Sequence, residues 1–109
     1  MFPATDFPRG YALATAMVAR GGRRVRFMYR EQAENDDDSG WRFFCGDEEQ
    51  AYVDDPANVA LYALTTIVAI DPSIALLLGT PAPCAFERDD ERDAFRASEG
   101  FGFAPEDEL

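Results

Sequence analysis

The sequence contains no histidine and no lysine, and its only cysteines are Cys45 and Cys84. Without histidine, the Ser–His and Cys–His pairs that activate many protein nucleophiles cannot form. A four-ligand zinc site is excluded for a related reason, because the two cysteines supply only half of the thiolate or imidazole ligands it needs. A glycine-rich phosphate loop is also missing, since Gly21-Gly22 has neither the spacing nor the lysine of such a motif.

A long uninterrupted apolar run is missing as well. The most apolar segment, 59–78, is broken by Thr65, Thr66 and Asp71-Pro72, so we do not expect it to span a membrane. Residues 1–6 lack the basic start and the apolar stretch of a secretory signal. We therefore expect a cytoplasmic protein whose two cysteines are buried free thiols rather than a disulfide.

Acidic residues dominate the charge that is present. The chain has 21 acidic residues against 10 basic ones, all of them arginine, and its formal net charge is -11. The arginines gather in residues 1–30, whereas residues 31–60 hold ten acids and one arginine. Such a field repels nucleic acid and anionic membranes and attracts basic proteins, although solubility alone is the alternative explanation. We therefore predict a protein partner, and neither nucleic acid nor a membrane.

Length and composition predict one small α+β domain. A chain of 109 residues is long enough for one core and too short for two, and 47% hydrophobic residues can fill it. We predict a mainly antiparallel sheet of about four to six strands, with short helices at 47–53 and 64–78 on one face. The domain is expected over 11–97, between an N-terminal arm at 1–10 and an acidic C-terminal tail at 98–109.

Alternating apolar residues give the predicted strands. Gly21-Gly22 is expected to join the first two strands in a tight hairpin, although the alanines of the first also allow a helix. In the second, Val25, Phe27 and Tyr29 are expected on the buried face, opposite an arginine stripe that pairs with the acidic loops. Asp47 is expected to cap the first helix. Asp71 is expected to cap a later helical segment that begins at Pro72. The strands are predicted at 11–20, 23–30, 41–45, 59–62, 82–88 and 93–97, with the third in a central position and the last at an edge.

Two acidic clusters flank the third predicted strand. The first is the loop 31–40, and Trp41 follows it directly. A tryptophan beside such a loop resembles an interface hot spot with a charged rim, but its alternation with Phe43 supports a core position at least equally. The second cluster begins at Asp47. The predicted partner-binding residues are Asp36, Asp37, Asp38, Trp41, Asp47, Glu48, Glu49, Asp54 and Asp55.

The same acids leave other functions open. The run 35–40 suggests calcium binding, but in an EF-hand register the closing glutamate would fall at Gly46, which cannot ligate. A weak divalent-metal site in a sensor, and acid–base chemistry by a pair such as Glu48 with Glu87 in a small enzyme, remain as alternatives. A third alternative is a structural module that associates through 59–78. Because the sequence shows acids but no pocket, we expect no enzymatic activity, catalytic residue, cofactor or bound metal.

Several short motifs stand out when they are taken together: Tyr29-Arg30-Glu31, Asp38-Ser39-Gly40-Trp41-Arg42-Phe43-Phe44, Gly46-Asp47-Glu48, Asp55-Pro56-Ala57-Asn58, Asp71-Pro72 and Ala85-Phe86-Glu87-Arg88. These motifs resemble one bacterial family. Over about residues 12–89 the chain is similar to the domain-of-unknown-function family 2185, also described as immunity-protein-33-like. The resemblance implies an intracellular protein that neutralises a toxin by binding it, without enzymatic activity or a cofactor. We expect the protein to be a monomer or a homodimer. A basic toxin would be steered to the acidic surface.

Overall fold

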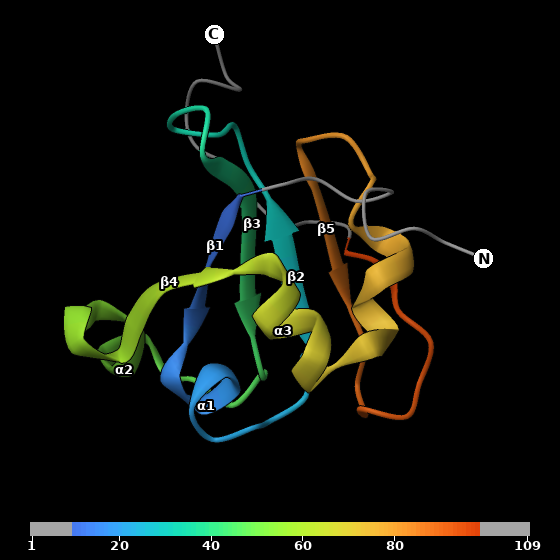
Figure 1. Ribbon diagram of the computed structural model, residues 1–109. Coiled ribbons are helices and arrows are strands. Elements are labelled where there is room, and N and C mark those ends of the chain that lie inside the picture. Colours follow the sequence, from blue (N-terminus) through green and yellow to red (C-terminus); the bar gives the residue numbers. More distant parts are fainter. Residues whose placement is uncertain (1–9, 99–109) are drawn as a thin grey trace, which may run out of the picture.

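Six strands form one sheet in the computed structural model, which describes residues 10–98 (Figure 1). The strand order is β4-β1-β3-β2-β5-β6. Within these residues the β1–β3 pair is parallel and the other four pairs are antiparallel, which confirms the predicted α+β class. The predicted arm and tail lie outside the described residues, apart from Gly10 and Ser98. The strands are β1 (Tyr11–Thr15), β2 (Phe27–Arg30), β3 (Asp38–Phe44), β4 (Val59–Ala63), β5 (Cys84–Glu87) and β6 (Arg96–Ala97).

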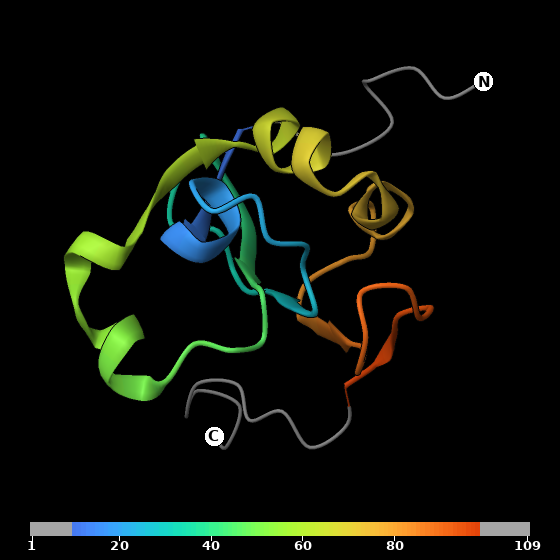
Figure 2. The ribbon, with the colours of Figure 1, turned by 90° about the horizontal axis from the view of Figure 1, so that it is seen from below.

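Short helices complete the fold. Figure 2 shows α3 and the 3-10 segment η3 on one side of the sheet and α2 on the other. The prediction that the helices of 47–53 and 64–78 share one face was therefore wrong, because Val53 of α2 lies against the face that carries Leu13 and Phe44. α1 packs against the core through Val18. No helix within residues 10–98 is long and apolar enough to cross a membrane. The helices are α1 (Ala16–Ala19), α2 (Gln50–Asp54) and α3 (Leu64–Ile70), and the 3-10 segments are η2 (Pro56–Asn58) and η3 (Pro72–Leu77).

The hydrophobic core lies between the sheet and the layer formed by α1, α3 and η3. Trp41 and Phe43 of β3 are its largest side chains, and both are fully buried. The indole Nε1 of Trp41 donates a hydrogen bond to the Leu78 carbonyl oxygen at 3.0 Å, so its one polar atom is satisfied inside the core. β3 lies between β1 and β2, which confirms its predicted central position. The other large core side chains are Val18, Val25, Met28, Leu64, Ile67, Ile74 and Leu78.

The predicted hairpin at Gly21-Gly22 was wrong. The first strand ends at Thr15 and the chain continues as α1, because alanines suit a helix once the strand has no further partner. The amide groups of Gly21 and Gly22 donate to carbonyl oxygens of α1, and Gly22 has a φ of 70°, which glycine adopts readily at a helix end. β1 pairs with β3 and β4, and not with β2.

The predicted faces of β2 were wrong for Phe27 and Tyr29, although Val25, which precedes the strand, is fully buried as predicted. Met28 is fully buried, whereas Phe27 and Tyr29 lie on the opposite, half-buried face. The register explains this, since Met28 pairs with Phe43 and Phe27 pairs with Phe44, and residues directly opposite share a face. Nearby arginines do pair with acids as expected: Arg24 with Asp71 and Glu91, and Arg26 with Asp47.

Of the two predicted helix caps, one is wrong and one is confirmed. Asp47 does not cap a helix, because α2 begins later, at Gln50, and Glu49 precedes it without a side-chain cap. Asp71 does cap η3, by accepting a hydrogen bond from the Ser73 amide at 3.1 Å. Both cysteines are free thiols, with Cys45 buried and Cys84 half-buried.

Candidate functional site

The predicted partner-binding acids lie in two groups at opposite ends of β3. The loop with Asp36 and Asp37 precedes β3, and the segment leading to α2 follows it. In Figure 1 this loop is at the top of the sheet and α2 is at the lower left. The seven residues of β3, at about 3.3 Å each, separate the groups by roughly 20 Å. We call Asp36 and Asp37 the loop patch, and Glu49, Asp54 and Asp55 the α2 patch.

Asp38 lies inside the protein rather than on the loop patch. Its carboxylate accepts hydrogen bonds from Arg42 Nη1 and Nη2, both at 2.9 Å, and from the amides of Glu34 and Gly40. Its side chain is fully buried, so Asp38 is a structural acid that closes the loop onto β3. The hydrogen bonds from Arg42 hold the pKa of Asp38 well below its usual range.

Trp41 belongs to the core, which is the alternative the sequence left open. Its exposed fraction is zero, and its ring stacks on Phe43 with centroids 6.1 Å apart. The side chain therefore has no surface to offer a partner in this conformation. Its contribution to a site is indirect, because it fixes the position of β3.

Glu48 holds the turn after β3. Its Oε2 accepts from Thr15 Oγ1 at 2.5 Å and from the Cys45 amide at 2.8 Å, and its Oε1 accepts from the Gly46 amide at 2.9 Å. Burial raises the pKa of Glu48, but these hydrogen bonds outweigh it, and the net pKa lies below the usual value. Glu48 therefore serves the fold first and offers little charge to the surface.

Asp47 is exposed and engaged by two arginines. Its carboxylate pairs with Arg23 and, at 2.5 Å, with Arg26. The hydrogen bond from Arg23 lowers the pKa of Asp47. Because both arginines face the same carboxylate, this corner is not a net negative feature.

The loop patch and the α2 patch keep their charge available. All five carboxylates are exposed, and among residues 10–98 none of them forms an ion pair. Asp54 accepts a hydrogen bond from Gln50 Nε2, and Asp55 caps η2 through the Ala57 amide. Five of the nine predicted residues are thus presented to solvent without a cationic partner within the described chain.

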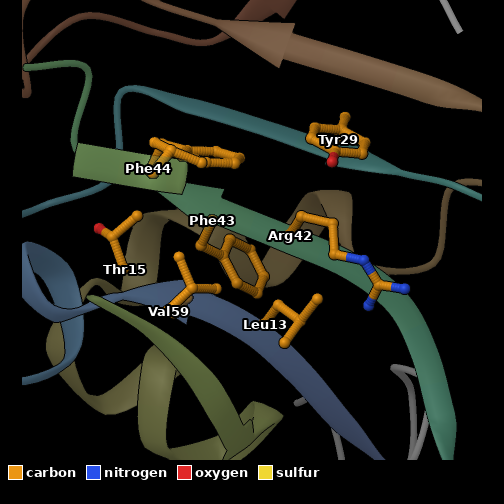
Figure 3. A pocket seen from close by; sticks show the side chains of 9 residues that line it. Leu13, Thr15, Tyr29, Arg42, Phe43, Phe44 and Val59 are labelled. Atoms are coloured by element: carbon orange, nitrogen blue, oxygen red, sulfur yellow. The ribbon is translucent and has the colours of Figure 1, made fainter. Parts of the chain in front are cut away.

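An apolar groove on the sheet face turned away from α3 was not predicted. A cavity of about 200 Å³ opens among Leu13, Phe44, Val53 and Val59 (Figure 3). A second cavity, of about 350 Å³, shares Tyr29, Phe44 and Val53 with the first. We call the two together the α2 groove. It lies between the two acidic patches, because its lining runs from the middle of β1 to α2.

Aromatic rings form the floor of the α2 groove. Phe44 stacks on Tyr29 at a centroid distance of 5.9 Å and lies 5.8 Å from Phe27. The sequence carried a signal for this cluster, since Phe44 is a large apolar residue on the face opposite Trp41 and Phe43. Its meaning was missed because Phe27 and Tyr29 were assigned to the core face.

The geometry of the described residues gives little support to the alternatives of metal binding and self-association. Within residues 10–98, no group of three or more His, Cys, Asp or Glu side chains is arranged to hold a metal ion. In the segment 59–78, Leu61 and Leu76 are the large apolar residues with the greatest exposure, at 56% and 77%. They lie on β4 and η3, on separate elements of the fold.

Comparison with known proteins gives one match. No curated protein and no solved structure matches the chain significantly. The family model described as "Immunity protein Imm33 domain" matches residues 12–99. This range contains all of the motifs on which the resemblance rested. Because the match covers well over half of the chain, the protein belongs to the Imm33 immunity protein domain family.

Proposed function

We propose that this protein neutralises a basic toxin in the cytoplasm by binding it directly, and that it has no enzymatic activity of its own. The family supplies the class of function. The loop patch and the α2 patch are the surfaces we assign to toxin binding. A stand-alone role in solubility would need no such arrangement of acids, since scattered charge serves that purpose equally well.

One observation carries the proposal: five exposed carboxylates without an ion pair within the described chain stand at the two ends of one strand. The net charge of -11 reinforces them. A surface of this kind raises the association rate of a basic partner by long-range attraction. Of the other five acids of residues 31–60, Glu31, Asp38 and Asp47 form ion pairs and Glu48 accepts three hydrogen bonds within the fold. Glu34 is exposed and adds to the negative charge of the loop patch.

The backbone under the loop patch is held in place, which favours binding. The Asp37 amide donates to Asn35 Oδ1 at 2.8 Å, and the Asp38 amide donates to the Asn35 carbonyl oxygen at 3.1 Å. Asn35 Nδ2 also donates to the Tyr11 hydroxyl at 3.2 Å. A pre-formed loop loses less conformational entropy on binding than a loose one.

Charge reversal tests this proposal. The loop variant (Asp36→Arg with Asp37→Arg) and the α2 variant (Glu49→Arg with Asp54→Arg) would each be used as bait in lysate of the source organism. A matched control, Asp89→Arg with Asp93→Arg, makes the same change in net charge at the exposed turn between β5 and β6. Captured proteins would be identified by mass spectrometry at about 50 mM and about 500 mM salt.

The expected result is one stoichiometric basic protein on the wild type and on the control. Its capture should fall at least tenfold with the loop or the α2 variant, and it should weaken as salt rises. If both variants capture that protein as well as the wild type does, the acidic patches are not the binding surface. Circular dichroism of each variant verifies that the fold is retained.

A further inference from the structure

We propose that the α2 groove receives an apolar side chain of the toxin that is flanked by arginine or lysine residues. This inference rests on the proposed function and adds the chemistry of the partner at one position. The acidic patches attract a basic surface, and the groove supplies the contact that holds it.

The lining of the groove is suited to an apolar side chain. Leu13, Val53 and Val59 come from β1, α2 and β4 and line the first cavity together with Phe44. Figure 3 shows Leu13 and Val59 side by side on the lower side of this cavity. Leu61 pairs with Leu13 across β1 and β4 and is 56% exposed, so it extends the apolar strip along the sheet. A cavity of about 200 Å³ equals several water volumes, since liquid water occupies about 30 Å³ per molecule, and it matches one large side chain in size.

The charges around the groove favour a basic neighbour for that side chain. The charged residues that line the two cavities are Arg42 and Glu48. Arg42 is already neutralised, because it pairs with Asp38 at 2.9 Å and with Glu31 at 2.8 Å. Asp54 follows Val53 directly and is exposed. The rim is therefore net negative, and an acidic flank on the partner would be repelled.

The apolar centre and the charged rim of such a surface contribute to different properties of binding, namely the affinity and the rate of association. Desolvation of an apolar anchor in a pocket supplies most of the affinity at protein interfaces and slows dissociation. Exposed rim charges act mainly on the rate of association and on its salt dependence. The groove lies between the two acidic patches, so one partner surface can reach the anchor and the charges together.

The test uses the full chain and defined peptides. The probe is the peptide Gly-Arg-Arg-Phe-Arg-Arg-Gly, and two control peptides replace the phenylalanine by serine or the arginines by glutamate. Methyl NMR signals of the ¹³C-labelled protein would be followed during titration. Protein variants are Val53→Asn and Leu61→Gln in the groove, and Leu76→Gln as a matched exposed leucine on η3.

The expected result is a saturable shift of the Leu13, Val53 and Val59 methyl signals with the phenylalanine peptide. Replacing phenylalanine by serine should weaken binding at least tenfold, as should Val53→Asn or Leu61→Gln, whereas Leu76→Gln should leave binding unchanged. The glutamate peptide should not bind.

Three outcomes would overturn the inference, and they differ in what else they affect. Equal binding of the serine and phenylalanine peptides would show that the groove does not bind an apolar side chain, but it would not contradict the role of the acidic patches. Failure of every arginine peptide to bind would count against both the groove and the acidic surface. A manyfold gain in binding on Phe101→Ser with Phe103→Ser would assign the groove to this chain's own C-terminal segment instead of a toxin.

Discussion

Substitution of Asp38 by asparagine should destabilise the protein strongly, although its neighbours Asp36 and Asp37 can be changed at little cost. Asp38 has a fully buried carboxylate that accepts four hydrogen bonds, two of them from Arg42. An asparagine of the same shape removes the charge and turns one acceptor into a donor that faces the guanidinium. Arg42, whose side chain is 3% exposed, then keeps Glu31 as its one ionic partner within the described residues.

The expected loss follows from the cost of breaking a buried ion pair, which is about 3–5 kcal/mol. At about 4 °C per kcal/mol for a domain of this size, the midpoint of thermal unfolding should fall by about 12–20 °C. Asp36→Asn and Asp37→Asn alter exposed acids and should stay within about 0.5 kcal/mol of the wild type.

Urea unfolding at pH 7, followed by circular dichroism, measures all three variants. A further variant, Asp38→Asn with Arg42→Met, removes both charges and should recover part of the lost stability, because the unpaired guanidinium causes much of the penalty. The reasoning would be refuted if Asp38→Asn lay within about 1 kcal/mol of Asp36→Asn.

Two further predictions concern pH and the core. The pKa of Asp38 is lower in the folded protein than the value of about 3.9 expected when unfolded, so its contribution to stability is present above that pH and is lost as the pH falls further below it. The urea midpoints of the wild type and Asp38→Asn should therefore stay apart by a constant amount from pH 7 down to about pH 4.5 and approach each other as the pH falls from there to about pH 2. Curves that stay parallel over that acidic range would contradict this. Trp41→Phe removes the hydrogen bond to the Leu78 carbonyl oxygen and some buried volume, so it should cost about 1–3 kcal/mol without altering capture of the toxin. A selective loss of capture, with the stability unchanged, would show that Trp41 contacts the partner after all.

The sequence predicted the parts of the fold that depend on local patterns. The β3 region has large apolar residues on both faces, which correctly indicated a central strand. The Asp71-Pro72 pair correctly indicated a cap and the start of a helical segment, because both residues act within one turn. The family resemblance, carried by motifs around residues 38–48, was confirmed by the match over residues 12–99.

The parts that failed depend on which segments meet in space. The hairpin at Gly21-Gly22 was inferred from two adjacent glycines, but β1 pairs in parallel with β3, and no local signal specifies a partner so distant in the chain. The faces of β2 followed from the same error, since an alternating strand reads equally well in either orientation until its neighbours are known.

The candidate site was predicted only in part for a similar reason. Composition identified acids, but composition does not separate a carboxylate that serves the fold from one that faces solvent. The carboxylates of Asp38 and Glu48 accept hydrogen bonds from Arg42, Thr15 and backbone amides, whereas those of Asp36 and Glu49 form no ion pair within the described residues. Predicting the α2 groove would have required the register of β2 against β3, because this register brings Tyr29 and Phe44 onto one face.

The central claim is that the protein neutralises its toxin by direct binding, and a titration of toxic activity tests it most directly. The captured basic protein would be purified, its toxicity measured in a bacterial host or an activity assay, and the immunity protein added in increasing amounts. The account predicts complete neutralisation near one equivalent of wild type, and a need for at least tenfold more of the loop or the α2 variant. Undiminished toxicity in the presence of excess wild-type protein that binds the toxin, or full neutralisation by both charge-reversed variants near one equivalent, would contradict it.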